Sequence, residues 1–91
     1  MAFKAISIIV TGKVQKVYFR ALTRELAEGL GLKGLVRNQP NGSVYIEAEG
    51  EETQLNKLIE WCKKGPPQAI VDSVNVSDAE PKYYKVFGVS I

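Results

Sequence analysis

The chain has 91 residues, 45% of them hydrophobic and 24% charged, with a formal net charge of +2 at pH 7. This length and composition predict one domain, residues 1–91, with a genuine hydrophobic core. The charge surplus is too weak to argue for nucleic acid as a partner, and no apolar run approaches the roughly 20 residues of a membrane span.

The first elements along the chain are a strand and a helix. Residues 5–11 (AISIIVT) are rich in β-branched side chains and predict a mostly buried strand. Leucines then recur every four residues from about 21 to 30, which predicts a helix with one apolar stripe made of Leu22, Leu26 and Leu30. Gly29 and Gly31 are expected to end this helix.

A hairpin and a second helix follow. The stretches "GLVRN" and "SVYIEAE" flank an Asn41-Gly42 pair, which is a strong hairpin signal. In the second arm apolar and polar residues alternate, so we expect Glu47 and Glu49 to share a solvated face. Residues 51–64 predict a helix that "GPP" ends, with a core-facing stripe made of Leu55, Leu58, Ile59 and Cys62.

Two more strands are expected at residues 69–77 and 85–91, separated by the polar "DAEPK". The order is therefore βαββαβ plus a short C-terminal strand. This order is typical of the α+β class, as a ferredoxin-like split β-α-β sandwich with two helices on one face of a mainly antiparallel sheet.

The residues usually used for catalysis are scarce. The chain has no histidine, and its one cysteine, Cys62, lies on a predicted core stripe, so we interpret it as a buried structural thiol. This composition argues against a zinc site. The single cysteine and the missing signal peptide favour the cytoplasm.

The loop between the first strand and the first helix is the strongest candidate site. Backbone amides that enter a helix N-terminus have no intrahelical partner, and the helix dipole favours an anion there. Arg20 stands at this position with a planar set of donors that suits phosphate. Nothing in the loop matches a nucleotide-binding P-loop, so neither nucleotide nor Mg²⁺ is implied.

Two motifs resemble those of a known family. Residues 12–20, "GKVQKVYFR", resemble the acylphosphatase signature G-x-V-Q-G-V-x-F-R, and "GLVRNQPNGSVYIEAEG" resembles the second signature of that family. Membership would imply a hydrolase without metal or other cofactor that splits acyl phosphates into carboxylate and phosphate. Arg20 would bind the phosphoryl group and Asn38 would position the attacking water. The phosphate cradle would be formed by the amides of Gln15, Lys16, Val17, Tyr18, Phe19 and Arg20.

Two positions depart from this pattern. Leu35 replaces an aromatic residue, which should alter packing rather than chemistry. Lys16 replaces the loop glycine; if that position needs a positive φ, lysine there costs on the order of 1 kcal/mol. The lysine ammonium could in turn attract phosphate.

The expected ligands are a small acyl phosphate and inorganic phosphate, the latter as product and competitive inhibitor. We expect a monomer with no nucleic-acid or membrane partner. The alternative is a non-catalytic anion- or RNA-binding module of the same fold. RNA-recognition modules stack bases on aromatic residues of the two central strands. Here the first strand core has none and the third strand has only Tyr45.

Overall fold

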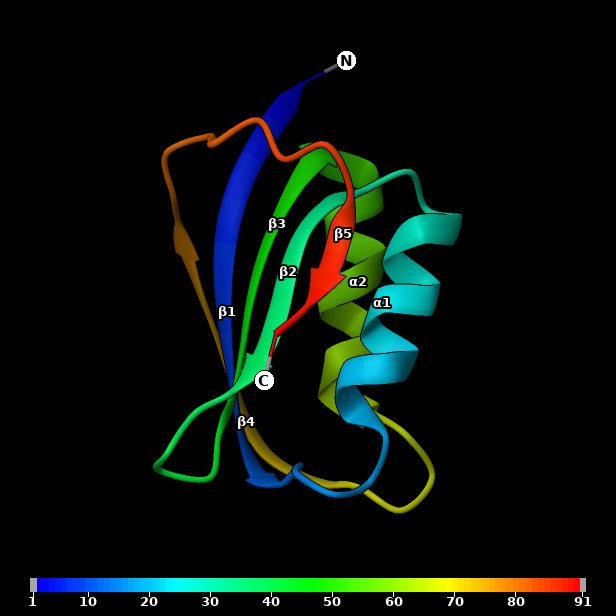
Figure 1. Ribbon diagram of the computed structural model, residues 1–91, viewed down its shortest axis with the longest axis vertical. Helices are drawn as coiled ribbons and strands as arrows, with labels where there is room; N and C mark the ends of the chain where they lie inside the picture. Colours follow the sequence, from blue (N-terminus) through cyan, green and yellow to red (C-terminus); the bar gives the residue numbers. More distant parts are fainter. Residues whose placement is uncertain (1, 91) are drawn as a thin grey trace.

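The computed structural model describes residues 2–90 and has two layers, a sheet and a pair of helices (Figure 1). The elements follow the predicted order, with bounds β1 (Phe3–Lys13), α1 (Phe19–Gly29), β2 (Lys33–Asn38), β3 (Val44–Glu51), α2 (Glu52–Lys64), β4 (Ile70–Asp78) and β5 (Phe87–Val89). The last strand is shorter than expected, and Ile91 lies outside the described residues.

The five strands form one sheet in the order β4-β1-β3-β2-β5. Every pairing is antiparallel except that of β5, which runs parallel to β2 at one edge. Both helices cover the same face of the sheet (Figure 1). The predicted ferredoxin-like fold is therefore confirmed.

The core lies between the sheet and the helices. Its strand residues come from alternate positions of the central strands, chiefly Ile6, Ile8 and Val10 of β1 and Val44, Ile46 and Ala48 of β3. The second helix contributes Leu55, Leu58 and Cys62, as its apolar stripe predicts, whereas Ile59 is half-buried.

The prediction that Leu22, Leu26 and Leu30 form the buried stripe of α1 is wrong. The buried residues of this helix are Phe19, Thr23 and Ala27, whereas Leu22, Leu26 and Leu30 are only half-buried. Small side chains at the centre of the contact allow a helix to approach the sheet closely, and the larger leucines then pack at its side. The end of α1 is as expected, because Gly31 adopts φ 74° and the amides of Gly31 and Leu32 bond back to the last turn.

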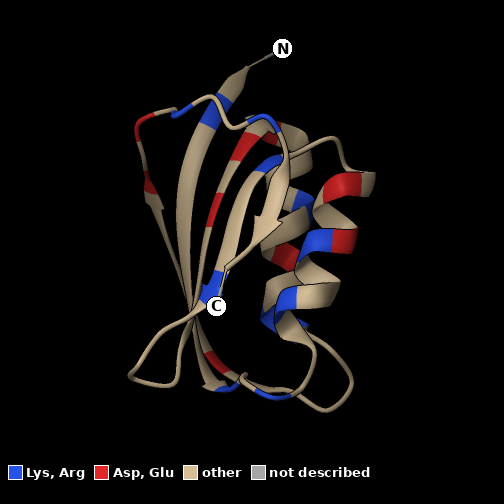
Figure 2. Cartoon of the chain, viewed as in Figure 1, with Lys and Arg blue, Asp and Glu red and all other residues tan. Residues whose placement is uncertain are grey.

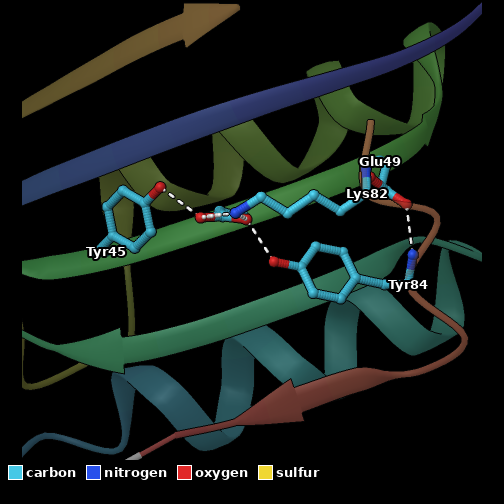
Figure 3. A network of polar contacts seen from close by, with 5 residues as sticks. Tyr45, Glu49, Lys82 and Tyr84 are labelled. Carbon is cyan, nitrogen blue, oxygen red and sulfur yellow. Dashed lines mark hydrogen bonds and ion pairs between the residues drawn. The ribbon is translucent and has the colours of Figure 1, made fainter. Parts of the chain in front are cut away.

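The outer face of the sheet is not the solvated surface that the alternation suggests. Glu47 and Glu49 do share that face, but the side chain of Glu47 is 15% exposed and Glu49 is 3% exposed. Residues 79–86, here called the crossing segment, connect β4 to β5 (Figure 1). The amides of Lys82 and Tyr84 in this segment bind Glu49 (Figure 3), and the side chains of the same two residues bind Glu47. The expectation that both carboxylates are solvated was wrong, because the crossing segment packs over them and its sequence has no regular alternation of apolar and polar residues that would predict this.

Candidate active site

The candidate site begins where β1 ends. The pairing of β1 with β4 shifts register between Thr11 and Gly12, and Gly12 adopts φ 122°. A Cβ at this position would collide with the backbone of Ile70 on β4. Glycine therefore allows β1 to lie against β4 through this irregularity as far as Lys13, after which the chain turns toward α1.

The loop that follows has an unusual backbone. Lys16 and Tyr18 adopt φ 64° and 65°, in the left-handed region that non-glycine residues rarely occupy. Val14 and Val17 are buried, so the loop is anchored to the core while its backbone stays near the surface. Left-handed residues alternating with ordinary ones build the concave turns in which proteins bind anions through amide N–H groups.

The amides of this loop are available to a ligand. Within residues 2–90, none of the amides from Gln15 to Arg20 donates a hydrogen bond to a backbone carbonyl. Tyr18, the N-cap of α1, gives no side-chain capping bond, and the first turn has no acidic residue. The N-terminus of α1 is thus left with the unsatisfied donors and positive dipole end that attract an anion.

The side chain of Gln15 joins the loop to the hairpin. Its Nε2 donates to the carbonyl oxygens of Gln39 at 2.8 Å and Ser43 at 3.0 Å. Asn38 immediately precedes Gln39, so this pair of bonds sets the distance between the loop and Asn38. The sequence indicated the backbone of Gln15 as part of the cradle and missed the role of its side chain.

Arg20 lies in the first turn of α1, half-buried. One of its terminal nitrogens donates to the carbonyl of Ser90 at 2.9 Å. This is the one hydrogen bond that the guanidinium makes with residues 2–90, and arginine has five N–H donors. The contact with Ser90 orients the guanidinium, and among residues 2–90 no other acceptor uses its remaining donors.

A pocket of about 760 Å³ brings the predicted residues together. Of the predicted site residues, those that line it are Lys16, Tyr18, Phe19, Arg20 and Asn38. Gln15 and Val17 do not line it, because the Gln15 side chain reaches the hairpin and Val17 points into the core. Asn38 makes no side-chain hydrogen bond with another of the described residues, so its amide can bind a water.

The pocket also contains residues that the sequence analysis missed. Arg24, Glu25 and Glu28 extend it along α1, where Arg24 and Glu28 form an exposed ion pair at 3.5 Å. Along this helix the basic residues come in the turns nearest the loop and the acidic residues beyond them (Figure 2). Arg20, Arg24 and Glu28 are spaced four residues apart, which predicts one helix face and could have revealed Arg24 and Glu28, although not Glu25.

Val89 closes the pocket from β5. Nothing in the local sequence signals that the last strand pairs with β2 beside α1, because a parallel pairing depends on the whole topology. The participation of Val89 and of the Ser90 carbonyl could therefore not be predicted.

The described part of the chain offers neither a cluster of metal ligands nor a reactive thiol at the pocket. Within residues 2–90 no cluster of three His, Cys, Asp or Glu could hold a metal ion. Burial raises the pKa of the Cys62 thiol to about 12, and the thiol lies in the core and does not line the pocket. The same residues contain no helix long and apolar enough to cross a membrane.

The chain is similar to known proteins over most of its length. The acylphosphatase family model matches residues 6–89. An acylphosphatase of Marinobacter nauticus is 57% identical over 67 residues, 74% of this chain and 73% of that protein. One of Acaryochloris marina is 48% identical over 81 residues, 89% of this chain and 87% of that protein.

A solved structure supports the same assignment. The structure of an acylphosphatase from Coxiella burnetii superposes with a TM-score of 0.93 at 41% identity, covering 97% of this chain and 93% of that one. Both sequence and fold therefore agree over nearly the whole length, and the chain belongs to the acylphosphatase family, whose members are hydrolases.

Proposed function

We propose that this chain hydrolyses acyl phosphates by binding the phosphoryl group with Arg20 and the loop amides while Asn38 orients the attacking water. The observation that carries the proposal is that Arg20, Asn38 and the left-handed loop line one pocket. The substrate phosphate would sit at the N-terminus of α1, where the amides of residues 15–20 have no backbone acceptor within residues 2–90.

Such a site suits an activated substrate. Hydrolysis of an ordinary phosphate monoester expels a poor alkoxide, and enzymes supply a general acid, a metal or a covalent nucleophile for it. An acyl phosphate is a mixed anhydride, whose leaving carboxylate is stable at neutral pH without a proton. The remaining work is to hold the phosphoryl group, to stabilise charge on its equatorial oxygens and to aim a water in line with the bond that breaks.

Each of these tasks has a candidate group in the pocket. The guanidinium of Arg20 and the loop amides are preorganised donors for the phosphoryl oxygens, so they need not reorganise as charge redistributes. The amide oxygen of Asn38 can accept a hydrogen bond from the water and direct its lone pair at phosphorus. The water attacks phosphorus, the bond to the acyl oxygen breaks with its electron pair, and a phosphoryl oxygen accepts the proton of the water.

The pocket is larger than the phosphoryl group alone requires, so the acyl group of the substrate would extend along α1 past Arg24. Inorganic phosphate would occupy the cradle as product and would therefore compete with substrate. We also expect the protein to act as a monomer in the cytoplasm.

Phosphate release from acetyl or benzoyl phosphate, with an aryl phosphate monoester for comparison and a chelator present, tests this function. We expect release from the acyl phosphates alone. Arg20→Ala should lose most activity together with phosphate inhibition, and Arg20→Lys should restore little, because a point charge does not reproduce the two-pronged contact. Phosphate binding without any turnover would instead indicate a non-catalytic anion-binding module.

A further inference from the structure

We propose that Glu49, on the face of the sheet away from the helices, is a positioning residue for Arg20. The inference rests on the proposed role of Arg20 in binding the phosphoryl group. Arg20 is oriented by the carbonyl of Ser90, directly after β5. A strand of three residues at the edge of a sheet is weakly held by its own pairing, so its placement depends on the chain that leads into it.

Glu49 holds that preceding chain through two backbone bonds. One carboxylate oxygen accepts the amide N–H of Lys82 at 2.8 Å, and the other accepts the amide N–H of Tyr84 at 2.7 Å (Figure 3). Glu49 is 3% exposed, and a carboxylate is rarely buried to this extent unless its oxygens are hydrogen-bonded. The proposed chemistry makes no use of this group, which lies on the other side of the sheet from the helices.

Glu47 strengthens the attachment two residues earlier on β3. Its carboxylate accepts a hydrogen bond from the hydroxyl of Tyr84 and pairs with the ammonium of Lys82 at 2.9 Å. The two outward-facing carboxylates of β3 therefore hold the same two residues of the crossing segment. Glu49 binds the backbone amides of Lys82 and Tyr84, and Glu47 binds their side chains.

Ser90, the residue that binds Arg20, lies six residues after Tyr84, and hydrogen bonds to β2 fix this stretch at both Val86 and Ser90. Two residues after Tyr84, the carbonyl of Val86 accepts the amide of Gly34 on β2 at 3.0 Å. The amide of Ser90 donates to the carbonyl of Val36 at 2.8 Å, and the carbonyl of Ser90 accepts from Arg20. Displacement of the crossing segment would therefore move or loosen the acceptor that orients the guanidinium.

Glu49→Gln is the appropriate perturbation, because it keeps the size of the side chain and replaces one oxygen with an NH₂ group. That group would face a backbone N–H and could not accept its hydrogen bond. The matched control is Glu80→Gln, an exposed residue of the same crossing segment whose side chain makes no hydrogen bond within residues 2–90.

The measurements are steady-state kinetics with acetyl phosphate, inhibition by inorganic phosphate, thermal unfolding, and NMR relaxation of the arginine side-chain Nε–H groups. The chain has three arginines, so Arg24 and Arg37 serve as internal references. In Glu49→Gln we expect kcat/KM to fall about tenfold and phosphate inhibition to weaken about as much, the size of one charge-assisted hydrogen bond. The Nε–H of Arg20 should become more mobile, and that of Arg24 should not. Glu80→Gln should match the wild type.

A purely structural role would have a different result. Glu49→Gln would then melt at a lower temperature, yet its kcat/KM and the mobility of Arg20 would be unchanged wherever the protein is folded, and this outcome would overturn the proposal. If Glu49→Gln does not fold, Tyr84→Phe removes the hydroxyl bond to Glu47 and leaves the backbone intact. We expect it to lower kcat/KM two- to threefold with partial loosening of Arg20, and unchanged values would equally overturn the proposal.

Failure of the proposed function itself would be recognised separately. If Arg20→Ala keeps full activity, then Arg20 does not bind the phosphoryl group, and the kinetic part of the test has no meaning. The NMR comparison would still show whether Glu49 orders the Arg20 side chain.

Discussion

Glu47 should make the stability of the protein depend on pH in the acid range. Burial of this carboxylate raises its pKa, but hydrogen bonds from the hydroxyls of Tyr45 and Tyr84 and from Lys82 outweigh that effect and lower the pKa from an ordinary value of 4.5 to about 2. The difference between these two pKa values corresponds to roughly 3 kcal/mol of folding free energy, as an upper limit. Because the folded pKa is the lower one, this stabilisation is present above about pH 5 and is lost as the pH falls toward 2.

Glu47→Gln isolates the contribution. We expect the variant to be less stable than the wild type by about 2–3 kcal/mol at pH 7, with the difference shrinking to near zero at pH 2. Urea unfolding at several pH values, followed by the fluorescence of Trp61, measures this, and urea leaves the ion pairs unscreened. The control Glu60→Gln removes an exposed ion pair with Lys63 and should change stability by under about 1 kcal/mol. A difference between Glu47→Gln and wild type that stays constant from pH 7 to pH 2 would refute the argument, because the loss would then come from packing and not from ionisation.

Three further predictions concern the site. Lys16 has a left-handed backbone at φ 64°, which costs a non-glycine residue on the order of 1 kcal/mol, so Lys16→Gly should raise the melting temperature. The same substitution should weaken phosphate inhibition, more so at low salt. An inhibition constant that does not depend on salt would show that the ammonium does not act on the anion. Asn38→Ala should lower kcat and leave phosphate inhibition about normal, whereas parallel losses would place Asn38 in the phosphate cradle instead. For wild type and Cys62→Ala alike, kcat should be nearly flat from pH 6 to 8 and insensitive to chelators; a steep limb near neutrality that disappears in Cys62→Ala would contradict the assignment of Cys62 to the core.

Local patterns were sufficient for most of the fold. The Asn41-Gly42 turn forms because Asn41 accepts the amide of Ser43 and Gly42 donates back to Gln39, all within five residues. The second helix follows its apolar stripe because Leu55, Leu58 and Cys62 recur on one face and are buried against the sheet. Such elements depend on neighbours in the sequence, and the sequence therefore predicts them.

The errors come from contacts between distant parts of the chain. Thr23 occupies the buried centre of α1, although its hydroxyl makes no hydrogen bond with the described residues, because its small size matters more there than its polarity. Glu49 looks solvated by alternation, yet amides 33 and 35 residues further along the chain cover it. The candidate site shows the same division: the loop and Asn38 could be predicted from two motifs, whereas Ser90 reaches Arg20 across 70 residues.

The strand order has a consequence for how the protein folds. β4 and β5, the last strands along the chain, form the two edges of the sheet, and only β2 and β3 are neighbours both in sequence and in the sheet. Three of the four strand pairings are therefore non-local, and such topologies fold more slowly than helical bundles of similar size. The acceptor for Arg20 follows the final strand, so the anion cradle is completed only when the β5 edge closes. If the β5 edge closes after the transition state, a phosphate ion that binds only the finished cradle should slow unfolding without accelerating folding.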